Sequence, residues 1–406
     1  MYSYVARQPI LDIEQQVVAY ELLFRDGQSN SFPDIDPNQA TSNILTNNHL
    51  TLGLEQVTGN LPAYINFHAD ALIFHFPSSL DPNNVVLEIL EDVPITDELL
   101  LACKSLHEKG YKLALDDFDF DAKWEAFYPI VDIIKIDVLQ FSILEISKLV
   151  RKISGLDITL LAEKVETYEA YNLALELGFE YFQGFFFSKP EMVQSKALPP
   201  SEMALAELLY ETSSVEMDLK KITDVFERDV NLSYKLLRYS NSAAFARRAE
   251  INTIKQALIV LGANEIKKLL SLLFAAQVSA DKPVELIRLS LTRARFGELL
   301  AISHGQFKDT GMAFLTGMMS LMDAILDETM ESVMQKLPLS AEIKAALLND
   351  EGLLAQYLNL VKFYEHADWE AANEIAKQLN LGEEVANAYH DALTWVNEQM
   401  QLMVKE

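Results

Sequence analysis

Two adjacent carboxylates, Asp116 and Asp117, directly follow the apolar run Leu113–Leu115. Neighbouring side chains on a strand point to opposite faces, so both can serve one site only if the chain leaves the strand at this point. Adjacent carboxylates repel each other, and a cation between them relieves that repulsion. The pair is therefore either a solvated turn that carries two acids or part of a cation-binding site.

Six other apolar runs also end near a polar side chain, which favours the second interpretation. We expect strands over residues 17–25, 62–68, 85–90, 112–118, 133–137, 160–165 and 181–187, and helices over stretches such as 37–53, 97–110, 143–154 and 168–177. Strands that alternate with helices predict a parallel sheet, and this many predict a (β/α)8 barrel. In such barrels each strand donates a residue to a site at its carboxyl end. The donors would be Glu21, Asn66, Glu88, Asp116, Asp117, Lys135, Glu163 and Gln183.

The predicted donor set is mostly acidic and contains neither histidine nor cysteine. Hard oxygen ligands of this kind favour Mg²⁺, Mn²⁺ or Ca²⁺ over zinc. The set holds more carboxylates than one ion needs, so we expect a two-metal site. Two ions of this kind clamp the attacking and leaving oxygens of a phosphoryl displacement.

Composition narrows the range of partners. The chain has 406 residues, 50% of them hydrophobic, and a net charge of −27, which predicts two to three domains with sizeable cores. Its acidity argues against binding a nucleic-acid polymer or an anionic membrane. Cys103 is the single cysteine, so no internal disulfide can form. The first residues do not resemble a signal peptide and no apolar run reaches the ~18 residues of a membrane span, so we expect a soluble cytoplasmic protein.

Over roughly residues 1–195 these motifs resemble those of the EAL-domain cyclic-di-GMP phosphodiesterases. Glu21-Leu22-Leu23 stands where the family has Glu-Ala-Leu, and Asp116-Asp117 stands at its metal-binding aspartates. The stretch Ala162–Glu166 matches the Ala-Glu-x-Val-Glu motif. The resemblance implies a TIM-like barrel of the EAL type that hydrolyses cyclic-di-GMP to linear pGpG. It also implies Mg²⁺ or Mn²⁺ as the cofactor, with two ions expected.

The resemblance assigns a role to each matching residue. Lys135 and Glu163 would orient and deprotonate the attacking water, and Asp116 would reach both ions. The implied metal ligands are Glu21, Asn66, Glu88, Asp116, Asp117 and Glu163. The implied catalytic residues are Lys135, Glu163 and Gln183. Arg25 and Asp137 would bind the substrate, and Glu91 and Glu166 would support the site.

Three positions depart from the family pattern. Leu22 replaces the middle alanine of the first motif and Lys164 replaces a glycine, and strand alternation predicts that both side chains point away from the site. Asp119-Phe120-Asp121 replaces Gly-Thr-Gly in a loop that contributes to metal binding and dimer coupling in the family. The loss of both glycines removes residues that readily adopt positive φ.

Beyond Lys189-Pro190 the composition changes and we expect only helices. Helical apolar spacing covers residues 203–211, 219–228, 231–240, 253–261, 265–278, 284–303, 312–326, 341–348, 353–366, 370–379 and 383–401. Asp229–Ser233, Ser240–Phe245 and the Ala257…Leu261-Gly262 pattern resemble the HDOD domain. We therefore expect an EAL domain over 1–196, a Pro-Pro linker over 197–202 and an all-α HDOD domain over 203–406.

HDOD domains resemble HD-type metal phosphohydrolases that lack the metal ligands. Thr316–Ser320 contains no His-Asp pair, and we interpret His390-Asp391, in the last helix, as a coincidence of an amphipathic helix. A group of methionines could form an adaptable binding surface or fill gaps in the core. This group comprises Met312, Met318, Met319, Met322, Met330 and Met334.

Three functions remain open at this point. The first is an active cyclic-di-GMP phosphodiesterase with a regulatory or protein-binding HDOD domain. The second is an inactive barrel that binds intact cyclic-di-GMP and signals through the HDOD domain, and the third is an adaptor in which both domains are relics. The complete set of strand-end ligands argues against the adaptor. The choice between enzyme and receptor depends on the loop Asp119–Asp121, and we favour the enzyme. A protein partner for the HDOD domain and a homodimer are further expectations.

Overall fold

The computed structural model describes residues 4–25, 54, 57–189, 205, 208, 219–228, 230–241, 251–278, 282–306, 309–337 and 339–404. The chain divides into two units, one of Met1–Lys189 with Glu365–Ala367 and one of Pro190–Tyr364 with Asp368–Glu406. The expected helix over 37–53, most of that over 203–211 and the linker over 197–202 lie outside the described residues.

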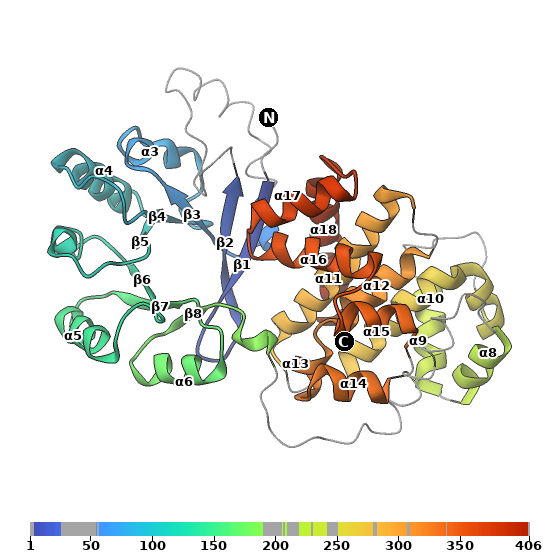
Figure 1. Cartoon of the computed structure of the whole chain (residues 1–406). Coiled ribbons are helices and arrows are strands. Elements are labelled where there is room, and N and C mark those ends of the chain that lie inside the picture. Colours follow the sequence, from blue (N-terminus) through green and yellow to red (C-terminus); the bar gives the residue numbers. More distant parts are fainter. Residues whose placement is uncertain are drawn as a thin grey trace. The chain divides into compact units, whose positions relative to one another are not determined.

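The first unit contains a closed barrel whose eight strands follow one another in chain order (Figure 1). Strands β2 to β8 pair in parallel, whereas β1 is antiparallel to both β2 and β8. The (β/α)8-like barrel and the presence of its seven predicted strands are confirmed, but β1 was not predicted. The strands expected over 112–118 and 181–187 end earlier, at Leu115 and Gln183, and a 3-10 helix follows at Phe186–Ser188. The strands are β1 (Tyr4–Leu11), β2 (Val17–Arg25), β3 (Ala63–Phe67), β4 (Val85–Ile89), β5 (Lys112–Leu115), β6 (Ile133–Asp137), β7 (Thr159–Glu163) and β8 (Tyr181–Gln183).

Helices α3 (Ala69–Ile73), α4 (Asp97–Glu108), α5 (Ile143–Ile153) and α6 (Tyr168–Glu176) lie outside the barrel (Figure 1). Local sequence signals set their limits. The hydroxyl of Thr96 accepts a hydrogen bond from the Leu99 amide and begins α4, while Ser142 and Glu145 form a capping box that begins α5.

An apolar layer fills the barrel interior beneath the polar side chains. It consists of Ile10, Ala19, Tyr64, Val86, Ala114, Ile133 and Leu161. Side chains return to the same face of a strand every two residues, so the next inward positions after Ala19, Val86 and Ile133 are Glu21, Glu88 and Lys135. The same step leads to Asn66, Asp116 and Glu163. The polar site is therefore the next layer of the barrel, towards the carboxyl ends of the parallel strands.

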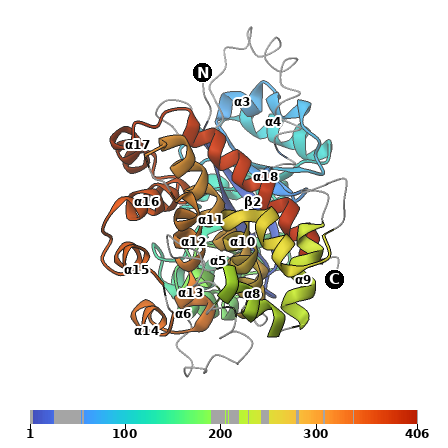
Figure 2. The same ribbon diagram turned by 90° about the vertical axis from the view of Figure 1, so that its right-hand side faces the viewer.

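The second unit shows only helices among its described residues (Figure 2). They are α8 (Leu219–Arg228), α9 (Val230–Ser240), α10 (Ile254–Val278), α11 (Val284–His304), α12 (Thr310–Met319), α13 (Met322–Leu326), α14 (Met330–Lys336), α15 (Ala341–Leu348), α16 (Leu353–Glu365), α17 (Trp369–Gln378) and α18 (Glu384–Val404). Gly262, with φ 74°, breaks α10 where two helices were expected. The single helix expected over 312–326 is wrong, because Ser320 and Leu321 separate α12 from α13, and α14 was not predicted.

Helix α12 is the core of this unit and packs closely on α11. A Cβ atom at Gly317 would lie 2.4 Å from the Arg293 backbone oxygen, so only glycine allows the two helices to approach so closely. The core interpretation of the methionines is confirmed for the five that are buried, Met312, Met318, Met319, Met322 and Met334. Among the described residues, no helix is both long enough and apolar enough to cross a membrane.

Candidate active site

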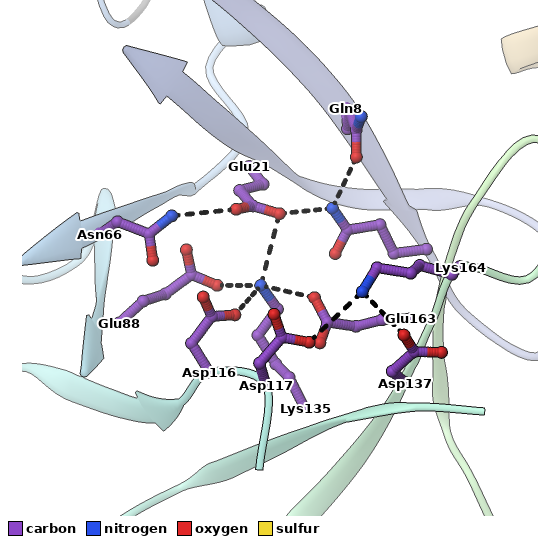
Figure 3. A network of polar contacts seen from close by, with 11 residues as sticks. Gln8, Glu21, Asn66, Glu88, Asp116, Asp117, Lys135, Asp137, Glu163 and Lys164 are labelled. Carbon is purple, nitrogen blue, oxygen red and sulfur yellow. Dashed lines mark hydrogen bonds and ion pairs between the residues drawn. The ribbon is translucent and has the colours of Figure 1, made fainter. Parts of the chain in front are cut away.

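The ammonium group of Lys135 lies at the centre of four carboxylates (Figure 3). The lysine side chain is fully buried. Its Nζ atom lies 2.6 Å from Asp116, 2.7 Å from Glu88, 3.0 Å from Glu163 and 3.3 Å from Glu21. Side chains from β2, β4, β6, β7 and the end of β5 thus meet at one point, as the barrel topology predicts.

Amide side chains hold the Glu21 carboxylate from two sides. Asn66 donates to one oxygen at 3.1 Å, and Gln183 donates to the other. The same Gln183 nitrogen donates to the Gln8 side-chain oxygen at 3.0 Å. Gln8 belongs to β1 and pairs in register with Glu21, so it is a site residue that the sequence analysis missed together with its strand.

Asp117 and Asp137 form a second acidic pair beside the first cluster, and Lys164 joins them (Figure 3). The Lys164 Nζ atom lies 2.7 Å from Asp137 and 3.6 Å from Asp117. The prediction that Lys164 points away from the site is therefore wrong. Strand alternation ends with Glu163, because Lys164 has a φ of 55° and lies beyond β7.

The loop after Asp117 is held without the family's glycines. Phe120 adopts a φ of 61°, so positive φ is present despite the loss of glycine, and its ring lies 5.3 Å from Phe118. The Asp119 carboxylate accepts hydrogen bonds from the Trp124 indole at 2.8 Å and from the Asp121 amide at 3.1 Å. Aromatic packing and carboxylate hydrogen bonds therefore fix this loop and the adjacent Asp117.

Gly184 is required where β8 ends next to the loop after β7. It has a φ of 144°, and a Cβ atom there would lie 2.1 Å from the Val165 backbone oxygen. This close approach places Gln183 next to Glu21. The Gln-Gly pair in the sequence thus has a steric cause.

Burial and mutual repulsion set the ionisation of the acidic cluster. Burial raises the pKa of Glu163 to about 8, although Lys135 opposes this effect, and burial with the charge of Glu21 raises the pKa of Glu88 well above its ordinary range. Burial lowers the pKa of Lys135, but the four carboxylates outweigh it and raise that pKa well above the ordinary value. Lys135 therefore remains a cation.

Several buried oxygen atoms of the cluster lack a hydrogen-bond donor. They are Asn66 Oδ1, Glu88 Oε2, Glu163 Oε2, Gln183 Oε1 and Asp117 Oδ1. Buried oxygens without donors are costly unless a donor or a cation satisfies them, and oxygen is what Mg²⁺ and Mn²⁺ prefer. These carboxylate and amide oxygens are therefore suitable ligands for such an ion. In the described parts of the chain, no group of three or more His, Cys, Asp or Glu side chains is arranged to hold a metal ion. In the acidic cluster, the Lys135 ammonium lies between the carboxylates.

Three predicted site residues lie apart from this cluster or cannot be placed. Glu91 is exposed and makes no ion pair with Lys135 or Lys164. Glu166 pairs with Lys189 at 3.2 Å instead of joining the network. The side chain of Arg25 lies outside the described residues.

The helical unit offers no comparable cluster at the positions considered from the sequence. Thr316 donates to the Met312 backbone oxygen at 2.8 Å within α12. His390 and Asp391 are exposed on α18, and His390 Nδ1 lies 3.9 Å from Asp391 Oδ1. Their exposure fits the amphipathic-helix interpretation.

Comparisons with known proteins match both halves of the chain. Residues 68–190 match the EAL domain model, and residues 198–351 match the HDOD domain model. The cyclic di-GMP phosphodiesterase CdgJ of Vibrio cholerae is 38% identical over 97% of this chain and 93% of its own length. The uncharacterized protein YuxH of Bacillus subtilis is 37% identical over 98% of this chain and 99% of its own. A solved structure of Klebsiella pneumoniae BlrP1 with calcium and cyclic di-GMP is 25% identical, with a TM-score of 0.38, over 47% of this chain and 56% of that one.

Proposed function

Because the chain belongs to the EAL–HDOD family that includes CdgJ and YuxH, we propose that it hydrolyses cyclic di-GMP to linear pGpG. The observation that carries this proposal is the convergence of Glu21, Glu88, Asp116 and Glu163 on Lys135 at the carboxyl ends of the strands. An adaptor would not need a buried acidic layer of this kind, because four buried carboxylates that share the Lys135 ammonium destabilise a fold. A receptor without turnover is not favoured, since every expected oxygen donor is retained.

In the proposed reaction the chain's own groups position and deprotonate a water molecule. Glu163 accepts the proton of that water as the general base, and the Lys135 ammonium 3.0 Å away stabilises its carboxylate form. Lys135 orients the water and offsets charge that develops on the phosphate. Gln183 and Asn66 keep Glu21 in place, and Gln8 holds Gln183.

We assign the metal ligands as Glu21, Asn66, Glu88, Asp116, Asp117 and Glu163, for two Mg²⁺ or Mn²⁺ ions. The unpartnered oxygens of Asn66, Glu88, Asp117 and Glu163 support this assignment. When bound, such ions polarise the phosphate and lower the pKa of bound water. Arg25 and Asp137 are assigned to substrate binding, and Glu91 and Glu166 to support of the surrounding loops.

The HDOD domain is proposed to regulate the barrel or to bind a protein partner. Its described helices bury their methionines, and it carries no ligand set at Thr316 or His390-Asp391. We propose domain limits of 1–196 and 203–406 with a linker over 197–202. A homodimer and a cytoplasmic location are also proposed, the latter because a chain with the single cysteine Cys103 does not rely on disulfides, as is usual for cytosolic proteins.

The test is a turnover assay on the purified full-length chain. We expect linear pGpG to form from cyclic di-GMP with Mg²⁺ and no product to form in EDTA. Asp116→Asn should abolish turnover, because it removes one charge from the centre of the cluster. Undiminished Mg²⁺-dependent turnover by Asp116→Asn would refute the assignment of Asp116.

A further inference from the structure

The acidic site contains two lysines, and they occupy different groups of carboxylates (Figure 3). Lys135 lies among Glu21, Glu88, Asp116 and Glu163, whereas Lys164 forms ion pairs with Asp117 and Asp137. Lys135 is fully buried, but the Lys164 side chain is 54% exposed. The second lysine is thus a half-exposed cation at the edge of the site.

Lys164 reaches these carboxylates because of its backbone conformation. A φ of 55° favours glycine, so a side chain other than glycine is unfavourable at this position. The left-handed turn directs the lysine towards Asp137 instead of letting it follow strand alternation. Its ammonium makes a 2.7 Å hydrogen bond to Asp137 Oδ2, while the other oxygen of Asp137 accepts from the Leu139 amide at 2.9 Å. Both oxygens of Asp137 therefore have a hydrogen-bond partner.

Asp117 is held much less completely than Asp137. Its Oδ1 atom is buried without a hydrogen-bond donor, and the Lys164 ammonium lies 3.6 Å away. This oxygen faces a single monovalent cation that is already bound to Asp137. A divalent ion at Asp117 would meet that positive charge at short range.

We propose that Lys164 is a built-in competitor of the second metal ion: its ammonium neutralises the Asp117–Asp137 arm and weakens divalent-ion binding there. This inference rests on the proposed metal site. Its effect on an ion held by Glu21, Glu88 and Asp116 is weaker, because the ammonium pairs with Asp117 and Asp137 and not with these residues. Lys164 is a positioning residue, which moves aside as the second ion binds. Metal binding therefore occurs in two steps, with the second at a higher ion concentration.

Calorimetric titration of the full-length, metal-free chain with Mn²⁺, without nucleotide, tests the proposal. Lys164→Gln removes the charge and keeps an unbranched polar side chain, one atom shorter than lysine. Lys164→Arg keeps the charge. Lys189→Gln is the matched control, because Lys189 is 51% exposed and pairs with Glu166 at 3.2 Å, away from the cluster.

We expect the wild-type chain to bind one Mn²⁺ tightly and a second one weakly. In Lys164→Gln the Kd of the second ion should fall by at least about tenfold, since a positive charge within a few ångströms is removed. Lys164→Arg and Lys189→Gln should titrate like the wild type. A second Kd that is the same in Lys164→Gln and wild type overturns the inference, even if the protein hydrolyses cyclic di-GMP.

The outcomes separate this inference from the proposed function. A tighter second ion in Lys164→Gln without hydrolysis by any variant supports the competition and refutes the phosphodiesterase. Absence of Mn²⁺ binding by every variant overturns both the metal site and the inference.

Discussion

The pH dependence of stability in the metal-free protein provides a quantitative test of the buried cluster. Burial raises the pKa of Glu163 from its ordinary 4.5 to about 8. Between these two values the folded protein holds a proton that the unfolded chain has lost. The protonated Glu163 carboxyl therefore contributes its whole stabilisation of the fold below pH 4.5. This contribution is lost as the pH rises to about 8.

The size of the effect follows from the pKa of Glu163. Each pH unit between the two pKa values lowers the free energy of unfolding by about 1.4 kcal/mol, so the span from 4.5 to about 8 amounts to at most about 5 kcal/mol. Glu88 acts in the same direction, because burial also raises its pKa. Water that enters the site solvates the ionised carboxylates, so it reduces the combined effect of Glu163 and Glu88 on the free energy of unfolding.

The assay is urea unfolding in EDTA at several pH values from 5.5 to 7.5. We expect wild-type stability to fall over this range and Glu163→Gln to show a shallower fall, by up to about 1.4 kcal/mol per pH unit. Glu169→Gln, at an exposed position on α6, is the control and should keep the wild-type slope. A wild-type stability that is constant or rises, or a Glu163→Gln slope equal to that of the wild type, would refute the reasoning.

Three further predictions concern single residues of the barrel. Burial raises the pKa of Cys103 to about 12, so a thiol reagent at pH 8 should label it only after unfolding, and rapid labelling of the native chain would contradict this. Gly184→Ala should lower the free energy of unfolding by about 3 kcal/mol or more, because its Cβ would lie 2.1 Å from a backbone oxygen. At Gly178 an added Cβ would have no atom within 4 Å, so Gly178→Ala should lower the free energy of unfolding by only about 1–2 kcal/mol. An equal loss in Gly184→Ala and Gly178→Ala in urea unfolding would refute the steric argument. Gln8→Leu removes the acceptor of the Gln183 amide and should lower kcat by about tenfold with the fold intact, as judged by circular dichroism; unchanged kcat would count against its role.

Most of the barrel could be predicted from the sequence because each parallel strand is a short apolar run with a polar residue near its end. Strand β1 was missed because Arg7, Gln8 and Pro9 interrupt its apolar pattern and no helix separates it from β2. Antiparallel pairing of this kind leaves no βα rhythm to detect. Gln8 could have been found only by predicting a strand over Tyr4–Leu11.

The convergence of the acidic residues was predictable, but the positions of the two lysines were not. Strand alternation places Lys135 inside the barrel, yet it does not show that its ammonium lies among four carboxylates. For Lys164 the alternation gave the wrong face, because positive φ at a non-glycine residue has no signal in a single sequence. The break between α12 and α13 was missed because their apolar spacing continues through Ser320 and Leu321.

The central claim is that the barrel cleaves cyclic di-GMP and does more than bind it. A single-turnover experiment with the full-length chain in excess over labelled cyclic di-GMP and Mg²⁺ tests this most directly, because even slow cleavage becomes visible. We predict that the label appears in linear pGpG with the wild type, whereas with Glu163→Gln it remains in bound cyclic di-GMP. Recovery of intact, bound cyclic di-GMP from the wild type would contradict the account and identify the protein as a receptor.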